Sequence, residues 1–490
     1  MRGVVAAGHP VTAGAGADIL RAGGNAVDAA LAAMLMSFVC EPMLTGLGAG
    51  GYMLVAPPGA DPVLLDFFVE APGRGLPPGT APAPLRSVDV DFGDAVQAFN
   101  IGASAAGTYG AIAGVAAAAD RFGRLPLAEL AAAAVRAARE GVAVNEQQAY
   151  LFAILEPIAG ATPESRALLM PGGAPLRVGD VRHDPALADA LERLAAEGPA
   201  PFYTGDVAAA VSDWILARGG LITREDLAAY TAVAREPVRI GYRGTTVLTN
   251  PPPSAGGILL ARALALLDRD VPPPSVGAVV AAMEAAQAER TPAFLAGLAD
   301  PGFLERFTAA RLGATTHVSV VDDEGWACAV TCTNGEGCGE VVPGTGIHLN
   351  NMMGEQDLSP FGFHAHPPGR RLPSMMAPTI VLGDAGPRLV LGSAGSNRIR
   401  SAILQVVVGV LDHGRAVQEA IDAPRIHVED DIVYAEPGVD TSALEAAERT
   451  IVRFSARNLF FGGAQAVERR GGALSGGGDP RRGGAVALAD

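Results

Sequence analysis

The segment Gly313–Asp322 carries hydroxyl and imidazole side chains in a pattern that alternates at a period of two. In an extended strand, successive side chains point to opposite faces. Thr315, His317 and Ser319 would therefore share one face of a strand. A threonine hydroxyl can act as a nucleophile once a neighbouring base takes its proton.

A second alternating segment, Trp326–Thr333, follows the turn-forming residues 322–325. The two segments predict a hairpin in which Thr315 lies opposite Cys332 or Thr333, depending on the length of the turn. The hydroxyls of Thr315 and Thr333 would then be within reach of each other. Threonine is also common in strands for packing reasons, so spacing leaves both a catalytic and a structural interpretation open.

His317 has two interpretations, as a general base or as a hydrogen-bonded structural residue. The sequence contains no G-x-S-x-G motif and no H-E-x-x-H motif, which argues against a serine triad and a metalloprotease. We treat His348, His364 and His366 as structural.

The residues 46–51 match G-x-G-x-x-G, but a helical pattern precedes them and a strand pattern follows. A dinucleotide site needs the opposite order, so we expect these glycines to allow close backbone packing. Cys328, Cys332 and Cys338 lack the paired spacing of a metal site, and we interpret them as small core residues.

The composition excludes several classes of protein. The chain has 490 residues, 49% of them hydrophobic and 18% charged, which is typical of a globular protein with a large core. Its net charge of −16 argues against nucleic-acid binding through a basic surface. All 36 basic residues are arginine, which excludes lysine Schiff-base chemistry and a Walker-type phosphate loop.

The longest apolar runs, Ala29–Cys40 and Ala402–Leu411, are shorter than the ~18–20 residues of a membrane span. The segment Met1–Pro10 also lacks the ~7–15 apolar residues of a signal peptide. We therefore expect a cytoplasmic protein without a membrane segment.

The periodicity predicts a mixture of helices and strands, with strands dominating the last third. Predicted helices are Thr12–Leu20, Ala26–Cys40, Leu127–Glu140, Pro185–Glu197, Val207–Arg218, Val276–Ala288 and Arg398–Leu411. Predicted strands include Gly51–Pro57, Pro62–Phe68, Val238–Leu248, Thr315–Val321, Trp326–Thr333, Thr379–Leu382 and Arg388–Leu391. We expect Gly471–Gly484 to form a surface loop. This pattern favours an α/β or α+β sandwich.

Several segments, taken together and in order, resemble the γ-glutamyltranspeptidase family. They are Gly23–Ala30, Asn250–Gly257, Thr315–Asp322, Gly346–Asn351, Arg371–Met375, Gly392–Arg398 and Asp479–Arg482. The resemblance extends over nearly the whole chain, from about residue 8 to residue 484.

The resemblance implies an N-terminal-nucleophile hydrolase with an α+β fold, a four-layer αββα sandwich of two stacked sheets. It places a self-cleavage between Ala314 and Thr315. The products would be a large chain, 1–314, and a small chain, 315–490, interlaced as one catalytic unit. It implies no cofactor and no metal.

The same resemblance assigns the catalytic residues. The new α-amine of Thr315 would serve as the base for its own hydroxyl, because its ordinary pKa is near 7.7–8. Thr333 would hydrogen-bond Thr315, and Gly395 and Ser396 would form the oxyanion hole.

The substrate-binding positions depart from the family pattern. The acid that binds the glutamyl group matches Glu355 in place of an aspartate, and Met352 replaces a glutamine. Of two paired serines only Ser374 remains. The asparagine after the second threonine is Gly335, with Asn334 adjacent.

The family's carboxylate-binding arginine matches Phe68, which cannot pair with a carboxylate. Arg74 is the nearest replacement in the sequence, and Arg370 and Arg371 are other possible anchors.

Three functions remain open at this stage. The first is a self-processing threonine enzyme that transfers or hydrolyses γ-glutamyl groups of glutathione-like amides, passing the acyl group to water or an amino acid. The second is the same mechanism on another N-acyl amide, as in glutaryl-cephalosporin acylases or a biosynthetic deprotecting enzyme. The third is a non-catalytic scaffold, which need not cleave itself.

Overall fold

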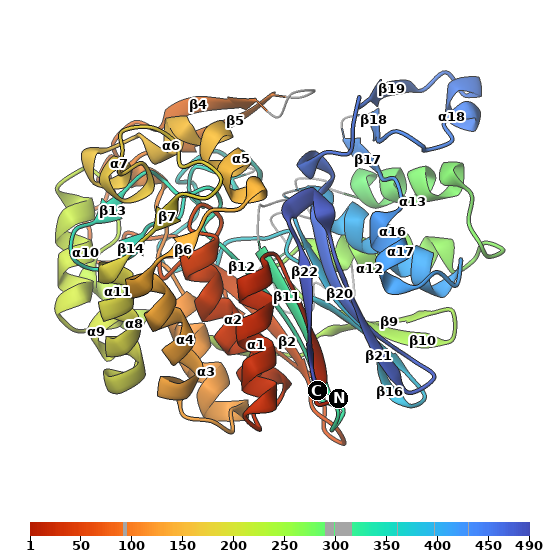
Figure 1. Ribbon diagram of the computed structural model, residues 1–490. Coiled ribbons are helices and arrows are strands. Elements are labelled where there is room, and N and C mark those ends of the chain that lie inside the picture. The colour runs from red at the N-terminus through yellow and green to blue at the C-terminus, as the bar shows by residue number, and fades with distance from the viewer. Residues whose placement is uncertain (92–95, 290–297, 299–315, 360, 396, 430) are drawn as a thin grey trace.

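The computed structural model describes the chain except residues 92–95, 290–297, 299–315, 360, 396 and 430. Two stacked β-sheets form its centre, and helices cover the outer face of each sheet (Figure 1). The prediction of a four-layer αββα sandwich is confirmed.

The first sheet has seven strands. Its order is β22 (Ala485–Ala489), β1 (Gly3–Ala7), β11 (Thr316–Asp322), β12 (Ala327–Thr333), β2 (Gly50–Ala56), β3 (Val63–Phe67) and β8 (Val233–Arg235). The second sheet has six strands, in the order β21 (Ala473–Gly478), β20 (Gly463–Arg470), β16 (Gly386–Ala394), β15 (Thr379–Gly383), β10 (Thr245–Thr249) and β9 (Val238–Tyr242). Segments before and after residue 315 contribute strands to both sheets.

Helices pack against the outer face of each sheet (Figure 1). On the seven-stranded sheet these are α1 (Pro10–Arg21), α2 (Ala26–Cys40) and α3 (Ala111–Phe122), with α4 (Leu127–Glu140) and α8 (Pro185–Glu197) outside them. On the six-stranded sheet they are α12 (Gly256–Leu267), α16 (Arg398–Leu411) and α17 (Val417–Asp422), with α13 (Val276–Ala288) against α12.

Peripheral elements surround this core. They are β4 (Arg86–Asp91), β5 (Val96–Ile101), β6 (Val142–Ala143), α5 (Glu146–Ile154), α6 (Glu156–Ala159), α7 (Pro163–Leu169), β7 (Val181–Arg182), α9 (Ala200–Tyr203), α10 (Asp206–Leu216), α11 (Arg224–Ala229), β13 (Val341–Val342), β14 (Ile347–His348), β17 (Ile426–Glu429), β18 (Ile432–Ala435), α18 (Ser442–Ala446) and β19 (Thr450–Arg453).

Helix α2 is buried along its whole length and lies behind β11 and β12. Its start is fixed by a capping box. The Asn25 side chain accepts hydrogen bonds from the backbone N–H groups of Val27 and Asp28, and the Asp28 carboxylate accepts one from Asn25 N–H. The Gly-Gly-Asn-Ala-Val-Asp motif therefore begins the helix that supports the central hairpin.

The hairpin between β11 and β12 has the predicted alternation. Val318 and Val320 face the helices, whereas His317 and Ser319 face the second sheet. His317 Nδ1 lies 2.8 Å from Thr331 Oγ1, and its Nε2 lies 2.9 Å from Ser319 Oγ. Burial lowers the pKa of His317 to about 3, so the imidazole is neutral at physiological pH and its role is structural.

Two predicted elements differ in the structure. The single strand predicted at Val238–Leu248 is a hairpin of β9 and β10, because Arg243 and Gly244 both have positive φ angles, 50° and 74°. The loop predicted at Gly471–Gly484 contains strand β21. Its glycines are needed for packing, since a Cβ at Gly476 would lie 2.5 Å from Val486 Cγ1.

The motif at residues 46–51 follows α2, and its last two glycines, Gly50 and Gly51, begin β2. A Cβ at Gly51 would lie 2.3 Å from the Thr331 carbonyl oxygen. The predicted close backbone packing is confirmed.

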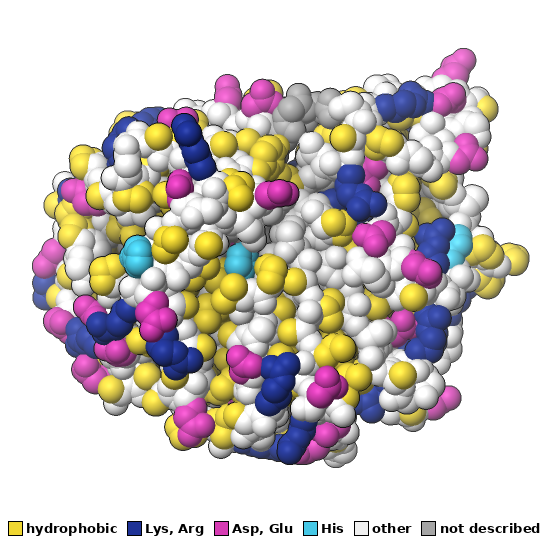
Figure 2. Space-filling model, in the orientation of Figure 1, with side chains coloured by type: hydrophobic (Ala, Val, Ile, Leu, Met, Phe, Trp, Pro, Cys, Tyr) yellow, Lys and Arg dark blue, Asp and Glu magenta, His cyan; other side chains and the backbone are white. Residues whose placement is uncertain are grey.

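The surface in Figure 2 shows acidic and basic side chains interspersed on the visible face. Within the described residues, no helix combines the length and the apolar character needed to cross a bilayer.

Gly392 on β16 tests how tightly the two sheets pack. A Cβ there would lie 2.3 Å from His317 Cε1, so Gly392→Ala should destabilise the fold by roughly 1–3 kcal/mol. Gly14→Ala is the matched control, because nothing lies within 4 Å of its Cβ and alanine favours a helix. Urea unfolding of both variants measures the difference, and equal stability would contradict this packing.

Candidate active site

The end of β12 carries Thr333, one of the predicted catalytic residues. Thr316 pairs with Cys332 across the hairpin, and Thr333 is the next residue on β12, where it pairs with Gly50. Thr333 is buried, with only 1% of its surface exposed. Its Oγ1 accepts a hydrogen bond from Gly335 N–H at 2.7 Å. Thr315, Ala314 and Ser396 lie outside the described residues.

Glu355, the predicted substrate-binding acid, lies beside the turn that follows Thr333. Gly335 has a φ of 63°, and a Cβ on it would lie 1.8 Å from Asn351 Oδ1 and 3.2 Å from Glu355 Oε1. Because residue 335 is glycine, the Asn351 amide can occupy the space that a side chain would fill. The Glu355 carboxyl lies beside this amide. Glu355 itself is buried.

Asn334 is buried within the same turn. Its Nδ2 donates to the His348 carbonyl at 3.1 Å, and its backbone N–H donates to the Leu44 carbonyl at 2.9 Å. This side chain thus holds neighbouring backbone together.

Gly395 directly follows β16 and has a φ of 118°, and its carbonyl accepts a hydrogen bond from Arg398 N–H at 3.1 Å. Helix α16 begins at Arg398, directly after this turn. The N-terminal end of a helix favours negative charge, so the turn suits a developing oxyanion.

Ser374 is clamped by the Asn250–Gly257 loop. Its carbonyl accepts hydrogen bonds from Ala255 N–H at 2.7 Å and Ser254 Oγ at 3.0 Å, and its Oγ accepts one from Met376 N–H at 3.1 Å. The Ser374 side chain is consequently held in a fixed position.

Phe68 and Arg74 are both engaged in contacts within the protein and are not free to bind a substrate. Phe68 is 1% exposed and stacks on Tyr52, with ring centroids 5.5 Å apart. Both terminal nitrogens of Arg74 donate to Glu70 Oε2 at 3.1 Å, and Arg74 also pairs with Asp226 at 3.7 Å. The predicted replacement arginine already has two carboxylate partners inside the protein.

Arg371 is similarly engaged. Its guanidinium lies 3.3 Å from Glu70 and 3.8 Å from Asp66, and Arg371 Cζ lies over the Tyr230 ring at 4.7 Å.

The four cysteines are buried free thiols. Among the residues that the structure describes, no group of three histidine, cysteine or acidic side chains is arranged to hold a metal ion.

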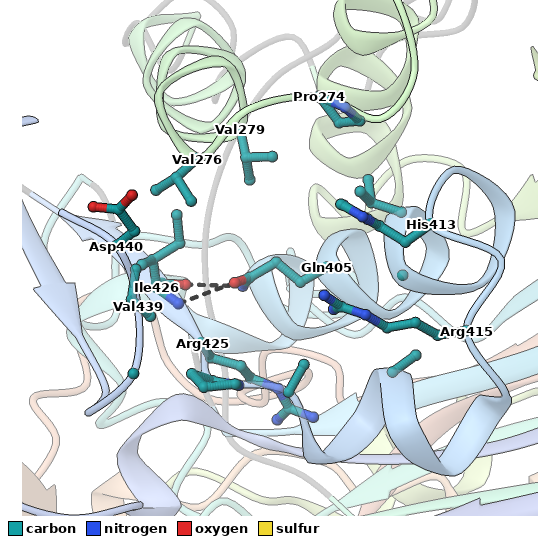
Figure 3. Close-up of a pocket in the computed structure, with 16 residues that line it drawn as sticks. Pro274, Val276, Val279, Gln405, His413, Arg415, Arg425, Ile426, Val439 and Asp440 are labelled. Atoms are coloured by element: carbon teal, nitrogen blue, oxygen red, sulfur yellow. Dashed lines mark hydrogen bonds between the residues drawn. The ribbon is translucent and has the colours of Figure 1, made fainter. Parts of the chain in front are cut away.

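A hollow of about 220 Å³ lies away from these residues, among α13, α16 and α17 (Figure 3). Two of its inner polar side chains, Gln405 and Arg425, are already engaged. Gln405 exchanges two hydrogen bonds of 2.9 Å with the Ile426 backbone, and Arg425 pairs with Asp479 at 2.6 Å. None of the predicted site residues lines it.

Sequence reasoning missed Glu41, which lies directly after α2. Its Oε2 accepts a hydrogen bond from Thr316 Oγ1 at 2.7 Å and its Oε1 one from Thr12 Oγ1 at 3.4 Å. Burial raises the pKa of the Glu41 carboxyl to about 7. No local motif marks this residue, because tertiary packing alone brings it to the start of β11.

The raised pKa of Glu41 predicts a pH dependence of stability. Above pH 4.5 the unfolded chain loses this proton, whereas the folded chain keeps it up to about pH 7. The free energy of unfolding should therefore fall between these values, by up to about 3 kcal/mol. Glu41→Gln should lose this component, while the exposed Glu129→Gln should retain it. Urea unfolding at pH 5 and pH 8 measures it, and an identical fall in Glu41→Gln would refute the assignment.

Comparisons with known proteins identify the family of this chain. Residues 12–489 match the family model for Gamma-glutamyltranspeptidase. The Acylase ACY 1 proenzyme of Pseudomonas sp. (strain SE83) is 34% identical over 486 residues, covering 91% of this chain and 86% of the relative. The glutathione hydrolase proenzyme of Escherichia coli (strain K12) is 32% identical over 534 residues, covering 98% and 90%.

Solved structures of similar proteins also match this chain. Cephalosporin acylase from Bacillus halodurans matches with a TM-score of 0.85 and 28% identity, covering 99% of this chain and 96% of that one. Helicobacter pylori gamma-glutamyltranspeptidase matches with a TM-score of 0.50 and 28% identity, covering 56% and 79%. The chain belongs to the gamma-glutamyltranspeptidase family and is an enzyme of the N-terminal-nucleophile hydrolase type.

Proposed function

We propose that the protein cleaves itself before Thr315 and then acts as a threonine acyltransferase and hydrolase on γ-glutamyl amides. The observation that carries the γ-glutamyl assignment is the buried carboxyl of Glu355 at the turn that follows Thr333. A carboxylate at this depth suits the α-ammonium group of a γ-glutamyl substrate, because charged hydrogen bonds are strong where water is excluded.

The chemistry follows from one residue and its neighbours. After cleavage, the free α-amine of Thr315 takes the proton from its own Oγ, which attacks the amide carbonyl. Backbone N–H groups around Gly395 stabilise the oxyanion. The C–N bond then breaks, the amine leaves with the proton, and water or a second amine attacks the acyl ester.

Thr333 supports the nucleophile by donating a hydrogen bond. Its Oγ1 accepts from Gly335 N–H, so its own hydroxyl proton is available to a neighbouring oxygen. In this proposal that oxygen is Thr315 Oγ.

A second candidate keeps the mechanism and changes the acyl group. Phe68, Met352 and Met375 belong to one buried apolar cluster where a carboxylate receptor is expected, and Arg74 is held by Glu70 and Asp226. This apolar lining supports an N-acyl amide that lacks the α-carboxylate. Relatives in the family include both glutathione hydrolase and acylase proenzymes.

Thr315→Ala tests the nucleophile. The wild-type protein should give two masses, one for a fragment that begins at Thr315, and should release the anilide from a γ-glutamyl anilide. The variant should remain a single chain of 49.7 kDa without activity. Intact-mass spectrometry and absorbance measure the two results. Cleavage of the variant would show that the nucleophile is misassigned, and an uncleaved wild type would favour a non-catalytic role.

Glu355→Ala separates the two substrate classes. Loss of the carboxylate should lower kcat/KM for the γ-glutamyl anilide by roughly 10–100-fold, while leaving the glutaryl anilide, which has no α-ammonium group, nearly unchanged. Glu355→Asp is the matched variant that keeps the charge. Unchanged γ-glutamyl kinetics in Glu355→Ala would favour the second candidate.

A further inference from the structure

The hollow of about 220 Å³ among α13, α16 and α17 has mainly apolar walls (Figure 3). The larger apolar side chains of these walls are Val276, Val279, Val408, Ile426 and Val439. Val279, Val408 and Ile426 are buried, so they form the inner part of the lining. An apolar cavity of about 150 Å³ is large enough to hold benzene. This hollow therefore has room for a ligand with one ring or a branched alkyl group.

The charged groups beneath these walls balance one another. Arg425 lies 2.6 Å from Asp479, and Arg481 pairs with both Asp479 and Glu436. Two guanidinium groups thus face two carboxyl groups inside the protein. Both ends of the Gln405 amide are bonded to backbone groups. The base of the hollow is polar but carries no net charge.

Arg415 differs from these groups because its charge has no partner. Its guanidinium points into the hollow toward Gln405 (Figure 3). Within the described part of the chain, this side chain forms neither a hydrogen bond nor an ion pair. Its backbone is nevertheless fixed, since its N–H donates to the Gly409 carbonyl at 3.0 Å and its carbonyl accepts from Arg470. The arginine thus presents an unpaired cation at a defined place on the rim.

Two other titratable side chains line the rim, and neither neutralises Arg415. Asp440 lies on the opposite side of the hollow, and its Oδ1 already accepts hydrogen bonds from Ser442 N–H at 3.1 Å and Ser442 Oγ at 2.6 Å (Figure 3). Burial and the neighbouring Arg415 lower the pKa of the His413 imidazole, which leaves it neutral at pH 7.5. A guanidinium without a counter-ion beside apolar walls favours an anion, and a carboxylate matches its planar fork.

We propose that this hollow is a second ligand site, separate from the reaction centre, which binds a small carboxylic acid with an apolar body about the size of one ring. Arg415 binds the carboxylate, and the apolar walls contact the body of the ligand. This inference does not depend on which amide the enzyme cleaves.

Benzoate and benzamide test the site, because they share the ring and differ in the carboxylate. Their affinities are measured at pH 7.5 by ligand-detected NMR titration of the full-length protein. Wild-type protein should bind benzoate roughly fivefold more tightly than benzamide, since a charged hydrogen bond at a partly exposed arginine adds to burial of the ring. Acetate, which lacks the ring, should bind more weakly than benzoate.

Variants of the hollow assign the binding to its two parts. Arg415→Gln should lower benzoate affinity to that of benzamide and leave benzamide affinity unchanged, which a misfolded protein would not do. Arg415→Lys should keep part of the preference. Val276→Phe places a larger side chain in the hollow and should weaken both ligands at least fivefold. The exposed Arg136→Gln on α4, which packs on the other sheet, is the matched control and should change neither affinity.

Three results would overturn the site. They are equal affinity of wild-type protein for benzoate and benzamide, a preference for benzoate that survives Arg415→Gln, and unchanged binding of both ligands in Val276→Phe. Thr315→Ala tests the separation from the reaction centre. It should bind benzoate as tightly as wild-type protein, and a loss of binding there would place the acid at the reaction centre and refute a second site.

Discussion

The antiparallel pairing of β11 with β12 at the centre of the molecule is the constraint on which the site depends. Every residue of both strands is buried, with helix α2 on one side and the six-stranded sheet on the other. A slip of one residue would turn His317 and Ser319 toward the helices and the valines toward the second sheet. Because both faces are packed, the register is fixed, and with it the position of Thr333 beside the start of β11.

Glycines that follow two of the strands leave room beside the backbone for the polar groups of the candidate site. Gly335 lies in the turn after β12 and Gly395 directly after β16, and both have positive φ angles that favour glycine. Neither has a side chain to fill the space around it. Asn351 and Glu355 occupy the space beside Gly335, and the Arg482 guanidinium occupies the space beside Gly395. The chemical groups of the site thus approach the backbone where side chains are absent.

The pattern of apolar residues predicted the helices whose bounds depend mainly on residues within or next to the helix. Helices α4, α8, α13 and α16 have the predicted bounds, and side-chain caps at Asp184 and Ser275 fix the starts of α8 and α13. The sequence pattern failed at Arg243-Gly244 and at the glycine-rich β21, where backbone conformation and packing decide the structure.

The site was predictable only in part. Resemblance to a family identified Glu355 and Thr333, which the structure brings to one turn. Glu41 and Glu336 lie in no recognisable motif, and their environment arises from distant segments of the chain. Thr315, Ala314 and Ser396, which lie outside the described residues, stay predictions.

The absence of lysine bears directly on how this protein uses positive charge. Burial beside another cation lowers the pKa of Arg482 to about 10, and the group remains charged at neutral pH. Lysine has an ordinary pKa near 10.4, well below that of arginine, so the same burial beside a cation would remove more of its charge at neutral pH. A guanidinium group therefore keeps its positive charge in a buried position where an ammonium group would lose much of its charge.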